Sequence, residues 1–179
     1  MPKKVIIFSL AYYPKYIGGA EVAVKEITDR IDPKEIEFDM VTLRFERNMP
    51  IHEKIGNINV YRVGLGFKHL LPLCKLLFPI TAFLRGALLN RKNKYDVVWS
   101  IMANRAGFAA LFLKTFYPKI KFLLTLQEGD TLDYPEKQMG ILRPFLSSVF
   151  KRIFTKADIV QTISNYLADW AKNMGAKGN

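Results

Sequence analysis

The chain has 179 residues and a formal net charge of +11, from 27 lysines and arginines against 16 aspartates and glutamates. Half of its residues are hydrophobic, which supplies a core and excludes a largely disordered chain. Its one cysteine, Cys74, cannot form an internal disulfide, so a disulfide-stapled secreted scaffold is excluded. The excess of positive charge predicts an anionic partner, which could be nucleic acid, anionic lipid or a phosphorylated substrate.

Neither export nor a membrane-spanning segment is expected. The apolar run at residues 5–8 is too short for the core of a signal peptide. The longest strongly apolar stretch, residues 70–84, is interrupted by Lys75 and falls short of the ~20 apolar residues that a spanning helix needs. With a single cysteine, these features predict a reducing, cytoplasmic location.

Short β-branched runs alternate with helical patterns along the chain. Strands are predicted at residues 4–9, 36–43, 58–63, 96–101, 121–126 and 158–164. Helices are predicted at residues 20–31, 103–116, 141–154 and 165–174. Residues 70–90 are helical in composition, but Pro72 and Pro79 are expected to break or kink that helix.

This alternation is typical of right-handed βαβ units. We therefore predict an α/β fold: a Rossmann-like three-layer α/β/α sandwich with a mainly parallel sheet, as one domain over residues 1–179. Ligands of such sheets bind outside the carboxyl ends of the strands. The loops of interest therefore follow strands, at residues 10–19, 102–105 and 127–133 and at Ser164.

The pair Gly18-Gly19 lies between the first predicted strand and the first predicted helix. Two glycines let a ligand approach the backbone closely, and a helix N-terminus offers N–H groups to a phosphate. The sequence contains neither G-x-G-x-x-G nor a Walker A motif, so a dinucleotide or P-loop site is not predicted. A flexible turn is the alternative explanation for the two glycines.

Three segments in this order resemble one known family. They are Tyr13-Pro14 followed by Gly18-Gly19-Ala20-Glu21, then Thr125-Leu126-Gln127-Glu128-Gly129-Asp130, then Ala157-Asp158-Ile159-Val160 running into Ser164. Together they resemble the N-terminal half of the retaining, nucleotide-sugar-dependent glycosyltransferases of family 4, which have the two-domain GT-B architecture. The resemblance covers nearly the whole chain.

The resemblance implies roles by position. Gly18 and Gly19 match the loop whose N–H groups meet the donor diphosphate at the interdomain cleft. The segment from Gln127 to Asp130 matches the loop near the acceptor and the transferring sugar, and these two residues are the catalytic candidates. The family usually has His where this chain has Gln127, and an amide can donate a hydrogen bond but cannot exchange a proton. The acceptor-side candidates are Tyr13, Glu21, Asn104, Glu128 and Ser164.

For Glu128, Asp130 and Asp133, the alternative to a role in the site is that their carboxylates are ordinary solvated side chains of a loop.

The resemblance also implies a second, donor-binding domain, which we expect to lie outside these 179 residues. The chain alone is therefore expected to be inactive. With that domain, the implied function is transfer of a sugar from a nucleoside-diphosphate sugar to a sugar or lipid-linked acceptor hydroxyl, in cell-surface glycan or glycolipid synthesis. The family needs no bound metal, and no His/Cys/Asp cluster here has metal-ligand spacing, so neither cofactor nor metal is expected.

Two basic segments rich in Leu and Phe, residues 67–94 and 143–156, suit helices that lie on an anionic membrane surface. The membrane-surface candidates are Lys75, Arg85, Arg143, Lys151, Arg152 and Lys156. A core-facing helix with a solvated basic face is the alternative. The basic residues follow no known nucleic-acid motif, so nucleic acid is not expected. A different class of function also stays open: a freestanding, non-catalytic Rossmann-like module that binds an anionic partner or a membrane surface.

Overall fold

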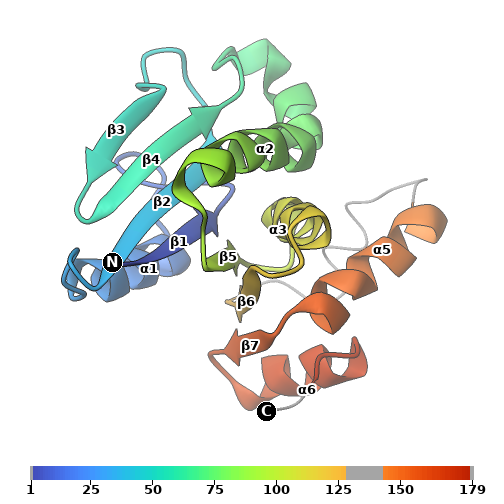
Figure 1. Cartoon of the computed structure of the whole chain (residues 1–179). Coiled ribbons are helices and arrows are strands. Elements are labelled where there is room, and N and C mark those ends of the chain that lie inside the picture. The colour runs from blue at the N-terminus through green and yellow to red at the C-terminus, as the bar shows by residue number, and fades with distance from the viewer. Residues whose placement is uncertain (1, 128–142, 178–179) are drawn as a thin grey trace.

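The computed structural model describes residues 2–127 and 143–177, and within them seven strands form one sheet in the order β3-β4-β2-β1-β5-β6-β7 (Figure 1). Neighbouring strands run parallel except β3, which is antiparallel to β4. The strands are β1 (Lys3–Phe8), β2 (Ile36–Leu43), β3 (His52–Ile55), β4 (Ile58–Val63), β5 (Val97–Ile101), β6 (Lys121–Leu126) and β7 (Ile159–Thr162).

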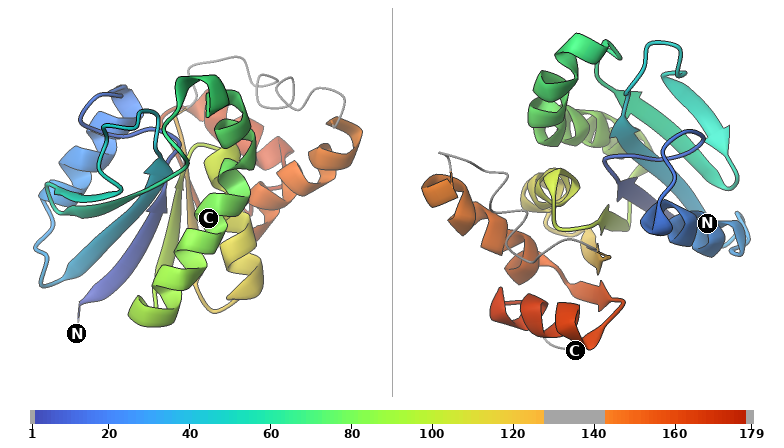
Figure 2. Two further views of the ribbon diagram at one scale, coloured as in Figure 1. Left: turned by 90° about the horizontal axis from the view of Figure 1, so that it is seen from above. Right: turned by 180° about the vertical axis from the view of Figure 1, so that it is seen from behind.

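Helices cover both faces of the sheet. The helical elements are α1 (Gly19–Asp29), the short 3-10 helix η1 (Lys68–Leu70), α2 (Leu71–Asn93), α3 (Arg105–Phe116), α5 (Arg143–Lys156) and α6 (Asn165–Asn173). Helix α1 lies on one face, whereas α2, α3 and α5 lie on the other and α6 packs beside β7 (Figures 1 and 2). The predicted Rossmann-like α/β architecture with a mainly parallel sheet is confirmed.

Strand β1 shows why these segments form a doubly covered sheet. Successive side chains of a strand point to opposite faces, so Ile6 and Phe8 pack in the core shared with α2 and α3. Val5 and Ile7 pack in the core shared with α1. All four side chains are buried, which is why the strand is an unbroken apolar run rather than an alternating one.

The order of the strands defines a switch point at β1. From β1 the chain moves outward through β2 to β4, and then returns to place β5 on the other side of β1. The loops that follow β1 and β5 therefore diverge at the carboxyl edge of the sheet. In open parallel sheets this is the place where ligands bind.

The structure corrects two sequence predictions about elements. Strand β3 was missed, because it has no apolar run, its exposed residues His52 and Lys54 alternate with half-buried ones, and only pairing with β4 makes it a strand. The predicted break of α2 is wrong, because α2 is one helix whose Pro72 lies in the first turn, where an N–H has no helical partner anyway. Its ribbon bends along its length (Figures 1 and 2), as expected for the predicted kink. The helix also continues through Pro79, flanked by Phe78 and Ala82, which are fully buried against the sheet.

The prediction of no membrane-spanning segment rested on the length of the apolar stretch, and that argument needs correction. Within the described residues, the helical stretch Lys68–Asn93 is long enough and apolar enough to cross a membrane by length and composition. The interruption by Lys75 does not remove this property. What the helix does with its apolar surface is considered below.

Candidate functional site

The N-terminus of α1 lies in the loop region that follows β1. Gly18 is the N-cap residue, with an extended backbone at φ −120° and ψ −176°. Its N–H donates a hydrogen bond of 2.7 Å to Oε2 of Glu21, so the carboxylate of Glu21 caps the first turn. A carboxylate is favourable there for the same reason as a phosphate, because the helix dipole and the unpaired N–H groups attract negative charge.

Neither glycine is required by the conformation or packing of the described residues. Neither lies in the left-handed region of backbone space. A Cβ atom at Gly19 would meet no atom within 4 Å, and one at Gly18 would meet only the flexible end of Glu21, with Oε2 at 2.8 Å. The tight-turn explanation for the two glycines is therefore weakened, whereas close approach of an external group would explain them.

The loop between β1 and α1 is fixed by the strands beside it. The carbonyl of Leu10 accepts hydrogen bonds from the N–H of Leu43 at 3.2 Å and the hydroxyl of Thr42 at 3.1 Å. The guanidinium of Arg62, on β4, donates to the carbonyl of Tyr13 at 2.8 Å and to that of Pro50 at 3.0 Å. The Arg62 side chain is fully buried and pairs with Glu53, so it anchors the loop from beneath.

A second set of contacts ties this loop to the segment after β2. Lys15 and Glu46 form an ion pair with Nζ and Oε1 2.6 Å apart. The ring of Tyr16 lies 4.2 Å from that of Phe45, centroid to centroid. The hydrogen bond from Lys15 holds the pKa of Glu46 below its ordinary value. The residues that lead to Gly18 are therefore held in place by contacts with the segment after β2.

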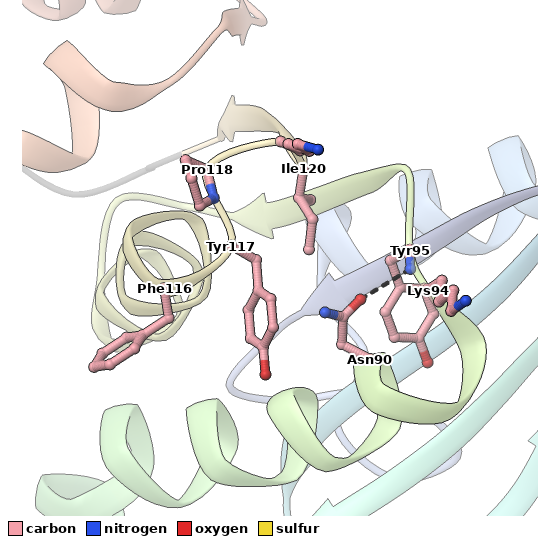
Figure 3. Close-up of a pocket in the computed structure, with 8 residues that line it drawn as sticks. Asn90, Lys94, Tyr95, Phe116, Tyr117, Pro118 and Ile120 are labelled. Carbon is pink, nitrogen blue, oxygen red and sulfur yellow. Dashed lines mark hydrogen bonds between the residues drawn. The ribbon is translucent and has the colours of Figure 1, made fainter.

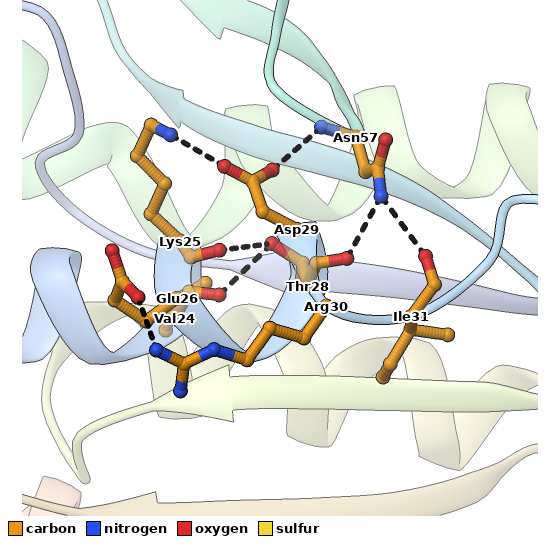
Figure 4. Close-up of polar contacts among 8 residues, drawn as sticks. All are labelled: Val24, Lys25, Glu26, Thr28, Asp29, Arg30, Ile31 and Asn57. Carbon is orange, nitrogen blue, oxygen red and sulfur yellow. Dashed lines mark hydrogen bonds and ion pairs between the residues drawn. The ribbon is translucent and has the colours of Figure 1, made fainter.

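The other end of α1 is held by the β3–β4 turn (Figure 4). The side-chain amide of Asn57 donates to the carbonyls of Thr28 at 3.1 Å and Ile31 at 2.9 Å. Its backbone N–H donates to Oδ1 of Asp29 at 2.9 Å, and Lys25 pairs with the same carboxylate. Helix α1 is therefore fixed at both ends, which sets the direction in which its N-terminus points.

The loops after β5 and β7 each begin a helix with a polar cap. Oδ1 of Asn104 accepts from the N–H of Ala106 at 2.9 Å at the start of α3. The hydroxyl of Ser164 accepts from the N–H of Leu167 at 3.3 Å at the start of α6. These two predicted acceptor-side residues therefore have a structural role in the described chain. Gln127 directly follows β6 and is half-buried.

The structure brings several predicted residues to one edge of the sheet. Gly18, Asn104, Gln127 and Ser164 follow β1, β5, β6 and β7 respectively, and parallel strands place their carboxyl ends together. Tyr13 belongs to the same edge, with its ring edge-to-face against Tyr12. The predicted residues Glu128, Asp130 and Asp133 lie outside the described residues.

The basic candidates for a membrane surface lie in two places. Nζ of Lys75 is 5.7 Å from the ring centroid of Phe45, and the guanidinium of Arg85 is 4.8 Å from that of Tyr61. Both side chains are half-buried and lean toward the domain. On α5, Arg143 begins the helix, and three candidates are exposed: Lys151, Arg152 and Lys156.

A cavity of about 320 Å³ lies at the opposite edge of the sheet (Figure 3). It is lined mainly by the segments that precede β5 and β6, including Asn90, Tyr95 and Tyr117. Oδ1 of Asn90 accepts from the N–H of Tyr95 at 2.9 Å, and the Tyr95 hydroxyl is bonded to Asp39. These polar groups serve the fold, and the amino ends of the strands are not where ligands of such sheets bind.

Over the described ranges, 2–127 and 143–177, no three His, Cys, Asp or Glu side chains come together in a way that could hold a metal ion. His52 instead stacks on Tyr61, with ring centroids 4.4 Å apart. His69 lies against Phe67. Among the described residues, the carboxyl edge of the sheet offers the backbone N–H groups of α1, the amides of Asn104 and Gln127, the hydroxyl of Ser164 and the carboxylate of Glu21.

The fold is a Rossmann-like α/β domain with the N-terminus of α1 in the loop region at its switch point. Residues 18–179 match the family model of the glycosyl transferase 4-like domain, and the chain belongs to this family. The resemblance predicted from the sequence is thereby confirmed. No curated protein matches the chain.

Solved structures of GT-B glycosyltransferases share the fold at low sequence identity. Sucrose-phosphate synthase from Thermosynechococcus elongatus has a TM-score of 0.69 at 15% identity, covering 99% of this chain and 46% of that one. The α,α-trehalose 6-phosphate synthase of Burkholderia multivorans has a TM-score of 0.60 at 12% identity, covering 97% and 43%. An E. coli trehalose-6-phosphate structure, bound with UDP-2-fluoro glucose, gives 0.57 at 12%, covering 96% and 42%. The chain spans less than half of each.

Proposed function

We propose that this chain is the acceptor-side half of a retaining glycosyltransferase. The enzyme moves a sugar from a nucleoside-diphosphate sugar to an acceptor hydroxyl on a cell-surface glycan or glycolipid. A second, donor-binding domain supplies most contacts to the nucleotide. Family membership supports the transferase activity, and the neighbour bound with UDP-2-fluoro glucose is consistent with this class of donor.

The observation that carries the proposal is the open N-terminus of α1. The first-turn N–H groups from Gly19 onward have no carbonyl partner earlier in the helix, and a Cβ added at Gly19 would meet no atom within 4 Å, so the surface beside that residue is open. Negative charge develops on the diphosphate as the bond to the sugar breaks. Preorganised N–H groups stabilise such charge without reorganising during the reaction.

The other residues at this edge bind and orient. Gln127 follows β6 and donates a hydrogen bond to a sugar hydroxyl, but it transfers no proton. Because the carboxylate of Glu21 shares the α1 N-terminus with the diphosphate, it moves aside when the donor binds. Its hydrogen bond to Gly18 is on the exposed surface, so this movement displaces no core contact.

The proposal is tested with the longest natural polypeptide that contains this chain. The protein is incubated with uridine, guanosine and adenosine diphosphate sugars and with sugar or lipid-linked acceptors, and released nucleoside diphosphate is measured. We expect release that depends on an acceptor from at least one donor. No release from any donor would contradict the enzyme assignment.

A companion measurement tests where the donor binds. Calorimetry on the 179-residue chain should detect no nucleotide-sugar binding tighter than ~1 μM, which corresponds to about −8 kcal/mol. Tighter binding would show that the donor site lies mainly within this half. Transfer by the isolated chain would contradict the need for a second domain.

A further inference from the structure

Helix α2 is apolar on two opposite sides, and only one of them packs against the protein. Its inner side carries Phe78 and Ala82, both fully buried. Its outer side carries an aliphatic stripe whose side chains are 41–63% exposed: Leu73, Leu76, Leu77, Ile80, Leu84 and Leu88. We call these six residues the α2 outer face. Their spacing of three and four residues places them on one side of the helix.

No described element of the chain covers this face. Only 17% of the most apolar window of the helix is buried. The apolar surface continues sideways through Phe83 to Phe116. The centroids of these two rings lie 5.2 Å apart, and Phe116 is 69% exposed. Contiguous exposed apolar surface of this kind marks an interaction site.

The charge around the face identifies the kind of partner. Residues 54–127 contain a single carboxylate side chain, Asp96, and it bonds to Lys3 and to the N–H of Lys4 at the amino edge of the sheet. The exposed cations Lys68 and Arg91 lie near the two ends of α2, and Arg91 follows Leu84 by seven residues, on the line of the stripe.

We propose that the α2 outer face inserts into the surface of an anionic bilayer, with α2 lying in the plane of the membrane. Aliphatic side chains enter the boundary of the acyl chains, and the terminal cations meet lipid phosphates. The stem of Arg91 can cover apolar surface while its head stays at the phosphates. This proposal does not rest on the proposed enzymatic function.

The inner side of α2 excludes a spanning arrangement. A Cβ atom at Gly86 would lie 2.6 Å from Cζ of Phe8, so the helix packs closely on β1. Crossing a membrane would separate Phe78, Ala82 and Gly86 from the sheet and expose the buried side of β1. An in-plane helix keeps these contacts and buries only the outer face.

The same charges disfavour a second copy of the chain as the partner. A two-fold dimer sets the same patch against itself, which would bring together two copies of a surface whose helix ends carry Lys68 and Arg91. An anionic bilayer offers the opposite charge. The membrane association predicted from the basic segments is thereby assigned to a particular surface, with the exposed leucines rather than Lys75 and Arg85 at its centre.

The test measures sedimentation of the protein with vesicles, without any nucleotide sugar. Vesicles contain phosphatidylcholine alone or phosphatidylcholine mixed with phosphatidylglycerol. The test variant combines Leu76→Gln, Leu84→Gln and Leu88→Gln, because Gln resembles Leu in helix propensity. The matched control combines Ile51→Gln, Ile159→Gln and Ile163→Gln, whose side chains are equally exposed, 58–66%, but lie elsewhere.

We expect the unaltered protein to bind anionic vesicles and not neutral ones, with salt weakening the binding. The leucine variant should lose at least about tenfold in partition coefficient, whereas the isoleucine control should bind normally. Unchanged circular dichroism and thermal unfolding of both variants show that the loss is not unfolding.

Several outcomes would overturn the proposal. They are equal binding to neutral vesicles, no binding to either kind, or unaltered binding by the leucine variant. Resistance of the membrane-bound protein to alkaline carbonate extraction would indicate a spanning helix instead. A dimer in sedimentation equilibrium that the leucine variant abolishes, without vesicle binding, would assign the face to a second copy.

Discussion

Helices α1 and α2 differ in how much of their surface the fold explains. The buried residues of α1 form one inward stripe, Ala20, Val24 and Thr28. Neighbouring segments anchor both the loop that leads into the helix and its C-terminal end. Helix α2 has an equally well packed inner side but leaves an aliphatic outer side without a described neighbour. The packing of this domain therefore accounts for α1, whereas the outer side of α2 requires a partner outside it.

The largest effect on stability is expected from Arg62→Met, which removes the anchor beneath the loop that leads to α1. The change leaves the carbonyls of Tyr13 and Pro50 without their donor and the carboxylate of Glu53 without its ion-pair partner. Removing one partner of a buried ion pair lowers the free energy of unfolding by about 3–5 kcal/mol. Urea denaturation of the variant and of the unaltered protein measures this loss in the free energy of unfolding.

Arg85→Met is the matched control, because Arg85 is half-buried and lies over the ring of Tyr61. It should lower the free energy of unfolding by only ~1 kcal/mol. Equal effects of the two changes would show that the loop is not held by Arg62.

The two sides of α2 can be compared directly with Gly86→Ala and Leu88→Ala. The added methyl at Gly86 would meet the ring of Phe8 at 2.6 Å, and overpacking of this kind lowers the free energy of unfolding by about 1–3 kcal/mol. Leu88 is 58% exposed, so its truncation should change stability by no more than about 0.5 kcal/mol. A large effect at Leu88 would mean that its side chain is covered within the domain.

Asn57→Ala releases the C-terminal end of α1. The change removes two side-chain hydrogen bonds, to the carbonyls of Thr28 and Ile31, and should lower the free energy of unfolding by about 1–2 kcal/mol. Lys54→Ala, at an exposed position on the same hairpin, is the control and should be nearly neutral. Hydrogen exchange of the α1 amides would report whether the helix end loosens locally.

The smallest effect concerns acid stability near α3. Burial tends to raise the pKa of Asp158, but hydrogen bonds from Lys114 and from the N–H of Phe122, and the charge of Lys114, outweigh it and hold the pKa below its ordinary value. A carboxylate with a lowered folded-state pKa stabilises the fold above its unfolded pKa of about 4. That contribution is lost as the pH falls through the folded value.

Asp158→Asn should therefore lower the free energy of unfolding by about 1 kcal/mol at pH 7 and flatten its decline toward pH 3. The free energy of unfolding is measured between pH 7 and pH 3 for the Asp158→Asn variant and for the unaltered protein, and the two curves are compared. A variant curve parallel to that of the unaltered protein would contradict the role of Asp158.

The sequence predicted the sheet well because its central strands, β1, β2, β5 and β6, are mostly buried on both faces and are rich in apolar residues. The predicted bounds of β2, β4 and β6 agree with the structure. Strand β3 was missed because it is defined by pairing with β4 and not by an apolar run. The anchor Arg62 was missed because its role depends on contacts such as that with the distant carbonyl of Tyr13. A buried guanidinium such as that of Arg62 cannot be distinguished by sequence from the many exposed ones.

For the candidate residues, the sequence predicted their place in the fold but not all of their contacts. Gly18, Gln127 and Ser164 were selected because they follow predicted strands, and the structure has the ends of those strands at one edge. The capping contacts of Glu21 and Asn104 depend on local backbone geometry, which the residue types permit but do not require. The sequence showed that the segment containing the α2 outer face is basic and rich in apolar residues. Which of its leucines are exposed depends on how the inner side of α2 packs on the sheet, and only the structure shows this.

The central claim is that Gly19 keeps space for a diphosphate in front of α1. The most direct measurement is sugar transfer by the longest natural polypeptide carrying Gly19→Val, with thermal unfolding measured alongside. Because a Cβ at this position meets no atom within 4 Å, the fold should tolerate the change. The control is Glu26→Val, on the exposed surface of the same helix. We predict a fall in kcat/KM for the donor of about 100-fold or more with an unchanged Tm, and near-normal transfer by the control. Normal transfer by Gly19→Val, or its unfolding, would contradict the claim.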